Sequence, residues 1–158
     1  MALKDRLISL RKERELQQID WEKRRDAWIV DIIKLYEDIG GWFSELFEEG
    51  FLKIKFRKKT LSEDYIGKYS VDCMELDLEV YPTVVLEPVG RNIIGYAGRI
   101  DVYIKGHESD KMMLFLVDDE DKKKYWELAK TSYNKKEKVR FNRKSFEKLL
   151  EYWLDAWS

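Results

Sequence analysis

The chain has 158 residues, of which 44% are hydrophobic, 14% aromatic and 39% charged, and this length and apolar content suit one domain with a packed core. Its 30 Lys and Arg residues nearly balance its 31 Asp and Glu residues, and the net charge of -1 excludes a strong overall attraction to nucleic acid or to an anionic membrane. The single cysteine, Cys73, excludes an internal disulfide, so we expect a cytoplasmic protein. No stretch approaches the roughly 20 apolar residues that cross a bilayer, so we expect no membrane association.

Residues 2–49 contain no proline and are predicted to be helical. From Trp28 to Leu46 the apolar residues alternate in steps of three and four, which is the spacing of one buried helix face. Gly40 and Gly41 are expected to bend or break this helix, since two glycines cost roughly 2 kcal/mol relative to alanine.

The first half of this helical region is polar, and its apolar residues are sparse. Leu7 and Leu10 begin a heptad-like rhythm that Trp21 and Trp28 would continue. One interpretation is a solvated helix that lies along the domain; the other is a coiled-coil contact with a second copy or another protein. An isolated polar helix is marginal in water, so we expect one of these contacts to support it.

From residue 51 the hydrophobic period changes from helical to two, which is typical of strands with one wet face. The candidate strands cover residues 51–57, 71–80, 83–86, 92–94, 99–104, 113–117, 125–129 and 139–141. Most of the spacers between them are too short for a helical crossover, so the region 51–141 predicts an antiparallel meander of about six or seven short strands.

Residues 142–157 are predicted to form a second amphipathic helix, with Asn142 as its N-cap. The apolar residues from Phe146 to Trp157 follow helical spacing and would face the sheet. The expected fold is therefore one α+β domain over residues 1–158, with a long N-terminal helix, a curved antiparallel β-meander and a C-terminal helix.

No complete catalytic motif occurs in the chain. One histidine, His107, and one cysteine cannot supply a usual zinc site. A Gly-x-Ser-x-Gly elbow, a Walker A loop and a Gly-x-Gly-x-x-Gly fingerprint are all absent. We therefore favour a non-enzymatic binding or assembly module without a cofactor, with Leu7, Leu10, Trp21 and Trp28 as its contact face.

The most distinctive segment is rich in glycine. It reads Glu87-Pro88-Val89-Gly90, then Ile94-Gly95, then Gly98-Arg99-Ile100-Asp101. Glycines at this spacing are typical of tight hairpins or bulges in a curved sheet. The segment resembles an uncharacterised bacterial protein family of similar length, and the resemblance covers about residues 25 to 157. It implies the same fold organisation and a bacterial source, but no known activity.

An alternative function uses the same segment. Asp101 after Gly98 resembles the first half of the PD-(D/E)xK motif of metal-dependent nucleases, and Glu120-Asp121-Lys122 has the letters of the second half. In that family two carboxylates bind Mg²⁺ and the Lys positions the attacking water. Here Glu120 and Lys122 follow a predicted strand instead of lying within it, in a run that resembles a solvated hairpin tip with Asp118.

A basic stretch follows, with aromatic residues interleaved. Its candidate phosphate contacts are Lys130, Lys135, Lys136, Lys138 and Arg140. The competing interpretation is that these residues are ordinary loop cations, or pair across the sheet with the acidic stretch of residues 63–87. We favour a protein partner or self-association over nucleic acid, because the local positive charge is cancelled elsewhere in the chain.

Overall fold

The computed structural model describes residues 2–79, 81–119, 123–130 and 137–157. The chain begins with helices α1 (Leu3–Gln18), α2 (Trp21–Trp42) and α3 (Ser44–Glu48). The strands are β1 (Leu52–Glu63), β2 (Gly67–Leu78), β3 (Val84–Gly90), β4 (Arg99–Ile104), β5 (Met112–Val117), β6 (Tyr125–Ala129) and β7 (Val139–Arg140), with a 3-10 turn, η1 (Glu108–Asp110), before β5. Helix α4 (Arg143–Trp157) closes the chain. The predicted α+β class is confirmed.

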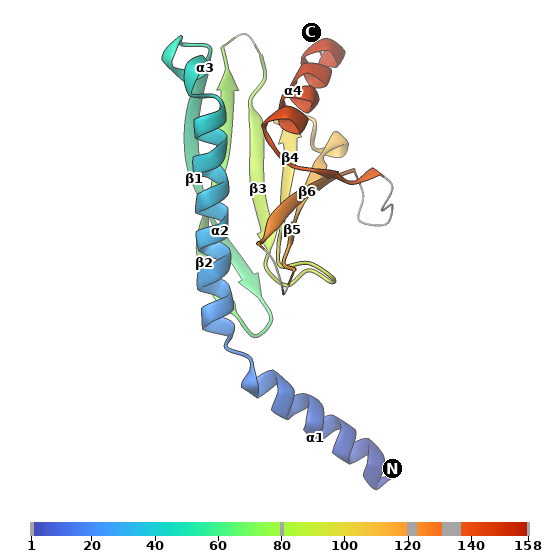
Figure 1. Ribbon diagram of the computed structural model, residues 1–158. Coiled ribbons are helices and arrows are strands. Elements are labelled where there is room, and N and C mark those ends of the chain that lie inside the picture. The colour runs from blue at the N-terminus through green and yellow to red at the C-terminus, as the bar shows by residue number, and fades with distance from the viewer. Residues whose placement is uncertain (1, 80, 120–122, 131–136, 158) are drawn as a thin grey trace.

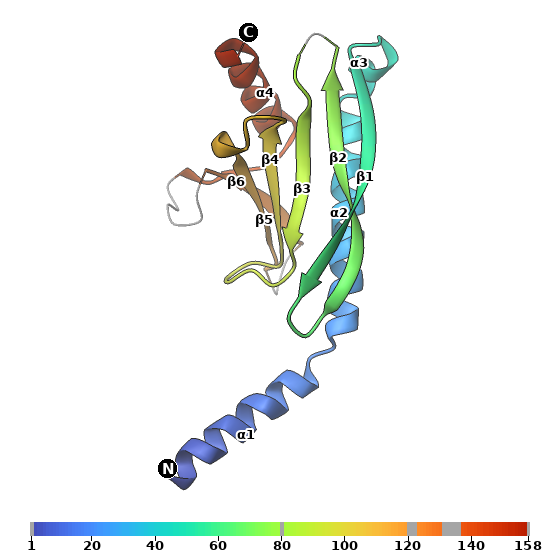
Figure 2. The same cartoon turned by 180° about the vertical axis from the view of Figure 1, so that it is seen from behind.

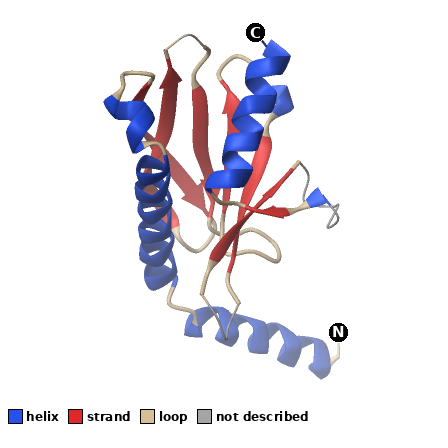
Figure 3. Ribbon diagram, turned by 45° about the horizontal axis from the view of Figure 1, so that its top comes forward, coloured by secondary structure: helices blue, strands red, loops and turns tan. Residues whose placement is uncertain are grey.

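The strands form one sheet in the order β1-β2-β3-β4-β5-β6-β7, and every neighbouring pair is antiparallel. This is the predicted meander. Helices α2 and α4 pack on the same face of the sheet (Figures 1 and 3). None of the four α-helices covers the opposite face, which Figure 2 shows from behind. The side chains on the face under α2 and α4 can therefore be apolar, whereas those on the opposite face have no helix to cover them.

The core lies between the sheet and these two helices. Helix α2 buries Trp28, Ile32 and Ile39, and α4 buries Phe146 and Trp153, each at most 4% exposed. The strands contribute their alternate apolar side chains to the same cluster: Met74, Leu76, Val84, Leu86, Ile100, Val102, Leu114, Leu116 and Leu128. The helical period of three and four and the strand period of two thus meet in one apolar layer.

Trp28 makes the closest approach of α2 to the sheet. A Cβ placed on Gly98, at the start of β4, would lie 2.1 Å from Cζ3 of the Trp28 ring. Gly98 also has a φ of 158°, which L side chains rarely adopt. Only glycine lets the indole ring rest on the main chain at this point.

The N-terminal helical region differs from the prediction in two places. It is broken at Ile19, whose ψ of 127° is extended, and Asp20 caps the new helix by accepting a hydrogen bond from the Lys23 N–H at 2.9 Å. Conversely, α2 continues through Gly40 and Gly41 and ends at Trp42. The buried face of α2 holds both glycines in helical conformation. The expected break lies two residues beyond Gly41, at Phe43, where α2 ends and α3 follows.

The sheet region also corrects two expectations. Strands β1 and β2 have 12 residues each, so this hairpin is longer than predicted. The two buried residues of β1, Leu52 and Leu61, have an even and an odd residue number, so the side of the strand that is buried changes along its length. This change is expected of a strongly twisted two-stranded ribbon. The predicted strand at 92–94 is wrong: that segment forms a turn closed by an isolated bridge between Ile93 and Tyr96.

Helix α4 begins as predicted. The Asn142 side chain accepts a hydrogen bond from the Ser145 N–H at 2.9 Å, and the Ser145 hydroxyl accepts one from the Asn142 N–H. This reciprocal cap satisfies two of the main-chain donors at the start of the helix. Among the described helices, none has the length and apolar content needed to cross a membrane.

Gly98→Ala should lower the free energy of unfolding by more than about 2 kcal/mol, since Trp28 must move out of a packed core. The matched control is Gly41→Ala, where a Cβ meets open space and helix propensity should raise stability by up to about 1 kcal/mol. Urea unfolding of both variants measures the difference. Equal stabilities for the two variants would contradict the Trp28–Gly98 contact.

Candidate functional site

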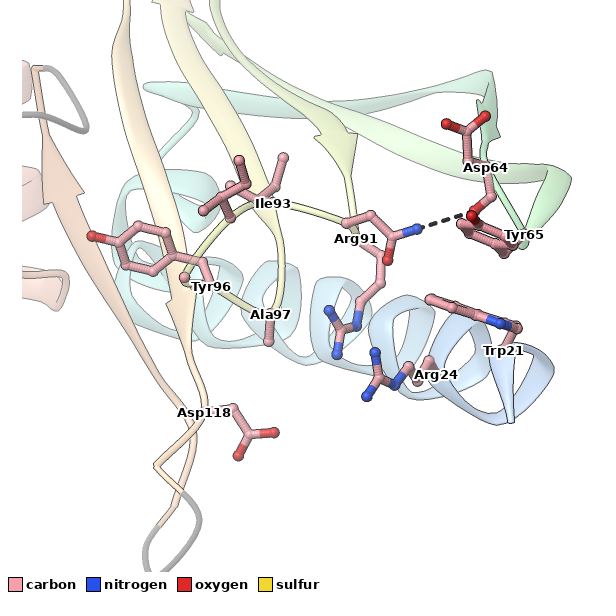
Figure 4. Close-up of a pocket in the computed structure, with 12 residues that line it drawn as sticks. Trp21, Arg24, Asp64, Tyr65, Arg91, Ile93, Tyr96, Ala97 and Asp118 are labelled. Atoms are coloured by element: carbon pink, nitrogen blue, oxygen red, sulfur yellow. Dashed lines mark hydrogen bonds between the residues drawn. The ribbon is translucent and has the colours of Figure 1, made fainter. Parts of the chain in front are cut away.

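Two adjoining cavities lie where the start of α2 meets the loop between β3 and β4, and they form one cleft that opens to solvent (Figure 4). Their volumes are about 610 and 460 Å³, within the range of small-molecule sites. The residues that line both cavities are Arg24, Arg91, Ala97 and Asp118.

One wall of the cleft is a stack of aromatic and guanidinium groups. The Trp21 ring lies on the Tyr65 ring with centroids 5.2 Å apart and an angle of 15° between planes. The Arg24 guanidinium lies 5.3 Å from the Trp21 centroid. Tyr65, at the tip of the β1–β2 hairpin, has a φ of 68°, which is unfavourable for a residue with a side chain. The stack therefore holds the hairpin tip in a strained conformation against α2.

The opposite wall is the loop at 91–97, and Glu63 at the end of β1 holds it. The Glu63 carboxylate accepts hydrogen bonds from the main-chain N–H groups of Arg91 at 2.9 Å and Asn92 at 2.8 Å, and from the Tyr69 hydroxyl. A Cβ on Gly90 would lie 2.8 Å from this carboxylate, so the position requires glycine or a shift of Glu63. The sequence prediction of a tight turn here is consistent with this geometry.

Two cations meet inside the cleft. The guanidinium groups of Arg24 and Arg91 point toward one another across the space between the two walls (Figure 4). Among the described residues, neither forms an ion pair within 4.0 Å. Burial and the positive charge of Arg24 lower the pKa of Arg91. Burial and the charge of Arg24 therefore make the charged form of Arg91 less favourable than it would be in water.

Acidic groups stand on the other side of the cleft. Asp118, just after β5, is exposed and lines both cavities. Asp31 on α2 is already paired, since its carboxylate lies 2.9 Å from the Lys124 ammonium. Asp118 is therefore the carboxylate at this side that is available to a ligand with hydroxyl or amino groups.

Asp101 lies elsewhere, on the face of the sheet that no α-helix covers. It is 7% exposed and takes two hydrogen bonds from Arg99, at 2.8 and 3.1 Å, with the Lys111 ammonium 3.2 Å away. Such a carboxylate is already neutralised by cations of its own chain.

This geometry gives the nuclease hypothesis no support. Asp118 lines the cleft and Asp101 does not. Glu120 and Lys122 lie outside the described residues, so their part of the hypothesis stays a prediction. Within the described part of the chain, no group of three or more His, Cys, Asp or Glu residues could hold a metal ion.

The same open face carries a network of ion pairs. Glu87 accepts hydrogen bonds from the Lys59 ammonium at 2.7 Å and the Tyr103 hydroxyl at 2.6 Å. Glu75 lies 3.5 Å from Arg57 and 3.8 Å from Lys105. The acidic stretch therefore pairs with cations of other strands. These cations are Arg57, Lys59 and Lys105, and not the described members of the basic stretch, with which the sequence predicted pairing across the sheet.

The described members of the basic stretch lie mainly against aromatic rings. The Lys138 ammonium is 4.8 Å from the Tyr96 centroid, and the Arg140 guanidinium is 4.3 Å from the Tyr125 centroid. Lys130 is exposed. Lys135 and Lys136 lie outside the described residues, so their predicted phosphate contacts are not tested.

The predicted contact face of the N-terminal helix divides in two. Leu7 and Leu10 on α1 are 55% and 44% exposed, and Trp21 is half-buried against Tyr65. Trp28 is wrong as a contact residue, since it is 1% exposed and belongs to the core. The predicted heptad-like pattern ran from α1 into α2, but these are two separate helices with a break at Ile19 between them.

Sequence reasoning missed the two arginines of the cleft. Neither Arg24 nor Arg91 belongs to a motif that the sequence analysis singled out. The available signal was the position of Arg91 directly after Gly90, in a turn between two predicted strands. No local pattern indicated that α2 would bring Arg24 to the same place.

Comparisons with known proteins give no assignment for this site: no family model matches the chain, and neither a curated protein nor a solved structure with significant similarity was found.

The Glu87 network generates a prediction about pH. Burial opposes the charge of Glu87, but the hydrogen bonds from Lys59 and Tyr103 outweigh it and hold the pKa of this carboxyl below its usual value. Its stabilising contribution is therefore full above the unfolded-state pKa of about 4.3 and is lost as the pH falls through the lower folded-state pKa.

Glu87→Gln should accordingly lower the free energy of unfolding by about 1 kcal/mol near neutral pH, and the difference from the unmodified protein should vanish in acid. Urea unfolding over a pH series measures both effects. The control is Glu147→Gln, which removes a solvent-exposed pair with Arg143 and should leave the free energy of unfolding nearly unchanged at every pH. A pH-independent loss in Glu87→Gln would contradict the assigned charge pairing.

Proposed function

We propose that this chain is a non-enzymatic binding module that assembles through α1, and that the partner of α1 is a second copy of the same chain. The observation that carries this proposal is the exposure of α1. Its 16 residues include none that is buried, and it exposes four large apolar side chains: Leu3 at 75%, Leu7 at 55%, Ile8 at 41% and Leu10 at 44%.

The position of α1 supports an intermolecular contact. The helix projects away from the sheet and from α2 and α4 (Figures 1 and 2). A helix of this length is marginal in water without tertiary packing. Burying one Leu side chain contributes about 1.5–3 kcal/mol, so a partner that covers Leu7 and Leu10 would stabilise the helix.

The side chains of α1 favour the α1 helix of a second copy as the partner. It carries both cations and anions, so a second copy can offer complementary charge: Lys4, Arg6, Arg11, Lys12 and Arg14 against Asp5, Glu13 and Glu15. The apolar surface also continues at the base of the helix. A hollow of about 370 Å³ lies there between Leu16, Ile19, Trp21 and Tyr65.

Two further observations support other parts of the proposal. The pairing of Asp101 with Arg99 and Lys111 favours a binding role over catalysis. The buried free thiol of Cys73 fits the reducing cytoplasm of a bacterial cell.

The double variant Leu7→Gln/Leu10→Gln should weaken self-association by at least about tenfold, since it removes two apolar contacts and keeps residues that favour helix. Size-exclusion chromatography with light scattering over a concentration series gives the mass, against 19.1 kDa for the monomer. The matched control, Lys144→Gln/Lys148→Gln, changes two exposed lysines of α4 and leaves α1 untouched, so it should leave self-association unchanged. An unmodified protein that stays at 19.1 kDa throughout would overturn the proposal.

A further inference from the structure

The cleft between α2 and the 91–97 loop has a chemistry that the α1 contact does not use. Leu7 and Leu10 are absent from both of its cavities, whereas Trp21 and Tyr65 line both the first cavity and the hollow at the base of α1. Its central feature is the pair of arginines, Arg24 from a helix and Arg91 from a loop. Two like charges of one chain lie in a single concavity, although in the described residues each has no carboxylate partner within 4.0 Å.

Other residues hold the main chain at Arg91 and the side chain of Arg24. Arg91 follows a turn whose main-chain donors are bound by Glu63. Arg24 lies over Trp21, which is stacked on Tyr65. A guanidinium group that is ordered before binding loses less conformational entropy when it takes a ligand. The arrangement is therefore organised in advance for an anion.

We propose that Arg24 and Arg91 bind the phosphate group of a small phosphate monoester, and that Asp118 accepts hydrogen bonds from hydroxyl or amino groups of the same ligand. Two guanidinium groups match a phosphate dianion in charge and offer forked N–H donors to its three terminal oxygens. The volume of about 610 Å³ admits a ligand of modest size beside the phosphate.

The shape of the cleft favours a small molecule over a nucleic acid. Asp118 stands beside the arginines, and a polyphosphate chain that ran past them would meet this negative charge. Of the described cations of the basic stretch, Lys138 and Arg140 lie against Tyr96 and Tyr125. Lys124 lines the second cavity, but its ammonium is paired with Asp31 at 2.9 Å, so it does not extend the arginine pair into a track of free cations.

Isothermal titration calorimetry with phenyl phosphate and with benzoate, which share a ring and differ in the anion, tests the assignment at low salt. We expect saturable binding of phenyl phosphate to the unmodified protein, and affinity at least about tenfold weaker for benzoate. Arg24→Gln and Arg91→Gln should each weaken phenyl phosphate binding by about tenfold or more.

The control variant Arg143→Gln removes one positive charge from an exposed position on α4 and should leave binding unchanged. Arg24 is exposed on a helix surface, so its substitution keeps the test valid even if Arg91→Gln impairs folding. Absence of phenyl phosphate binding, equal affinity for benzoate, or unchanged affinity in Arg24→Gln would overturn the proposal. So would tighter binding of a thymidine oligonucleotide than of phenyl phosphate, which would indicate a polyanion site.

Discussion

The contact of Trp28 with the main chain at Gly98 is the constraint on which the rest of the molecule depends. The indole ring rests where any side chain on residue 98 would stand, so α2 can approach the start of β4. This approach sets the position of the whole helix on the sheet, from the buried Ile32 to Ile39. It also brings the exposed residues of the first turns of α2 beside the loop that precedes β4. Arg24 faces Arg91 for this reason.

A second interaction, made by Glu63, fixes the loop at 91–97 that carries Arg91. The Glu63 carboxylate joins the end of β1, the Tyr69 hydroxyl and the main chain at Arg91 and Asn92. A partly buried carboxylate is costly unless it is hydrogen-bonded, and here it satisfies main-chain donors that a tight turn would otherwise leave open. The walls of the cleft, α2 and the loop at 91–97, are thus fixed by packing and hydrogen bonds. Helix α1, which precedes the break at Ile19, has no buried residue.

The two faces of the sheet follow from the meander topology. Helices α2 and α4 supply one apolar layer, and the other face has no helix to cover it. There Glu75, Glu87 and Asp101 are each paired with basic residues. These pairs lie across strands or along one strand, so the charge-rich composition serves the open face as well as the solvated helices. The proposed contact face lies instead on α1 and the cleft at the start of α2, and Gln18 is both the last residue of α1 and part of the cleft.

The sequence by itself determined the fold class, the meander and the N-cap of α4 at Asn142, because these depend on local periodicity and on residues within a few positions. It did not locate the break at Ile19, the continuation of α2 through Gly41, or the burial of Trp28. Each of those depends on which face of the helix meets the sheet. The cleft was decided by tertiary structure alone: Arg24 and Arg91 are 67 positions apart in the chain, and no pattern within either segment records that Trp28 packs on Gly98 and brings them together.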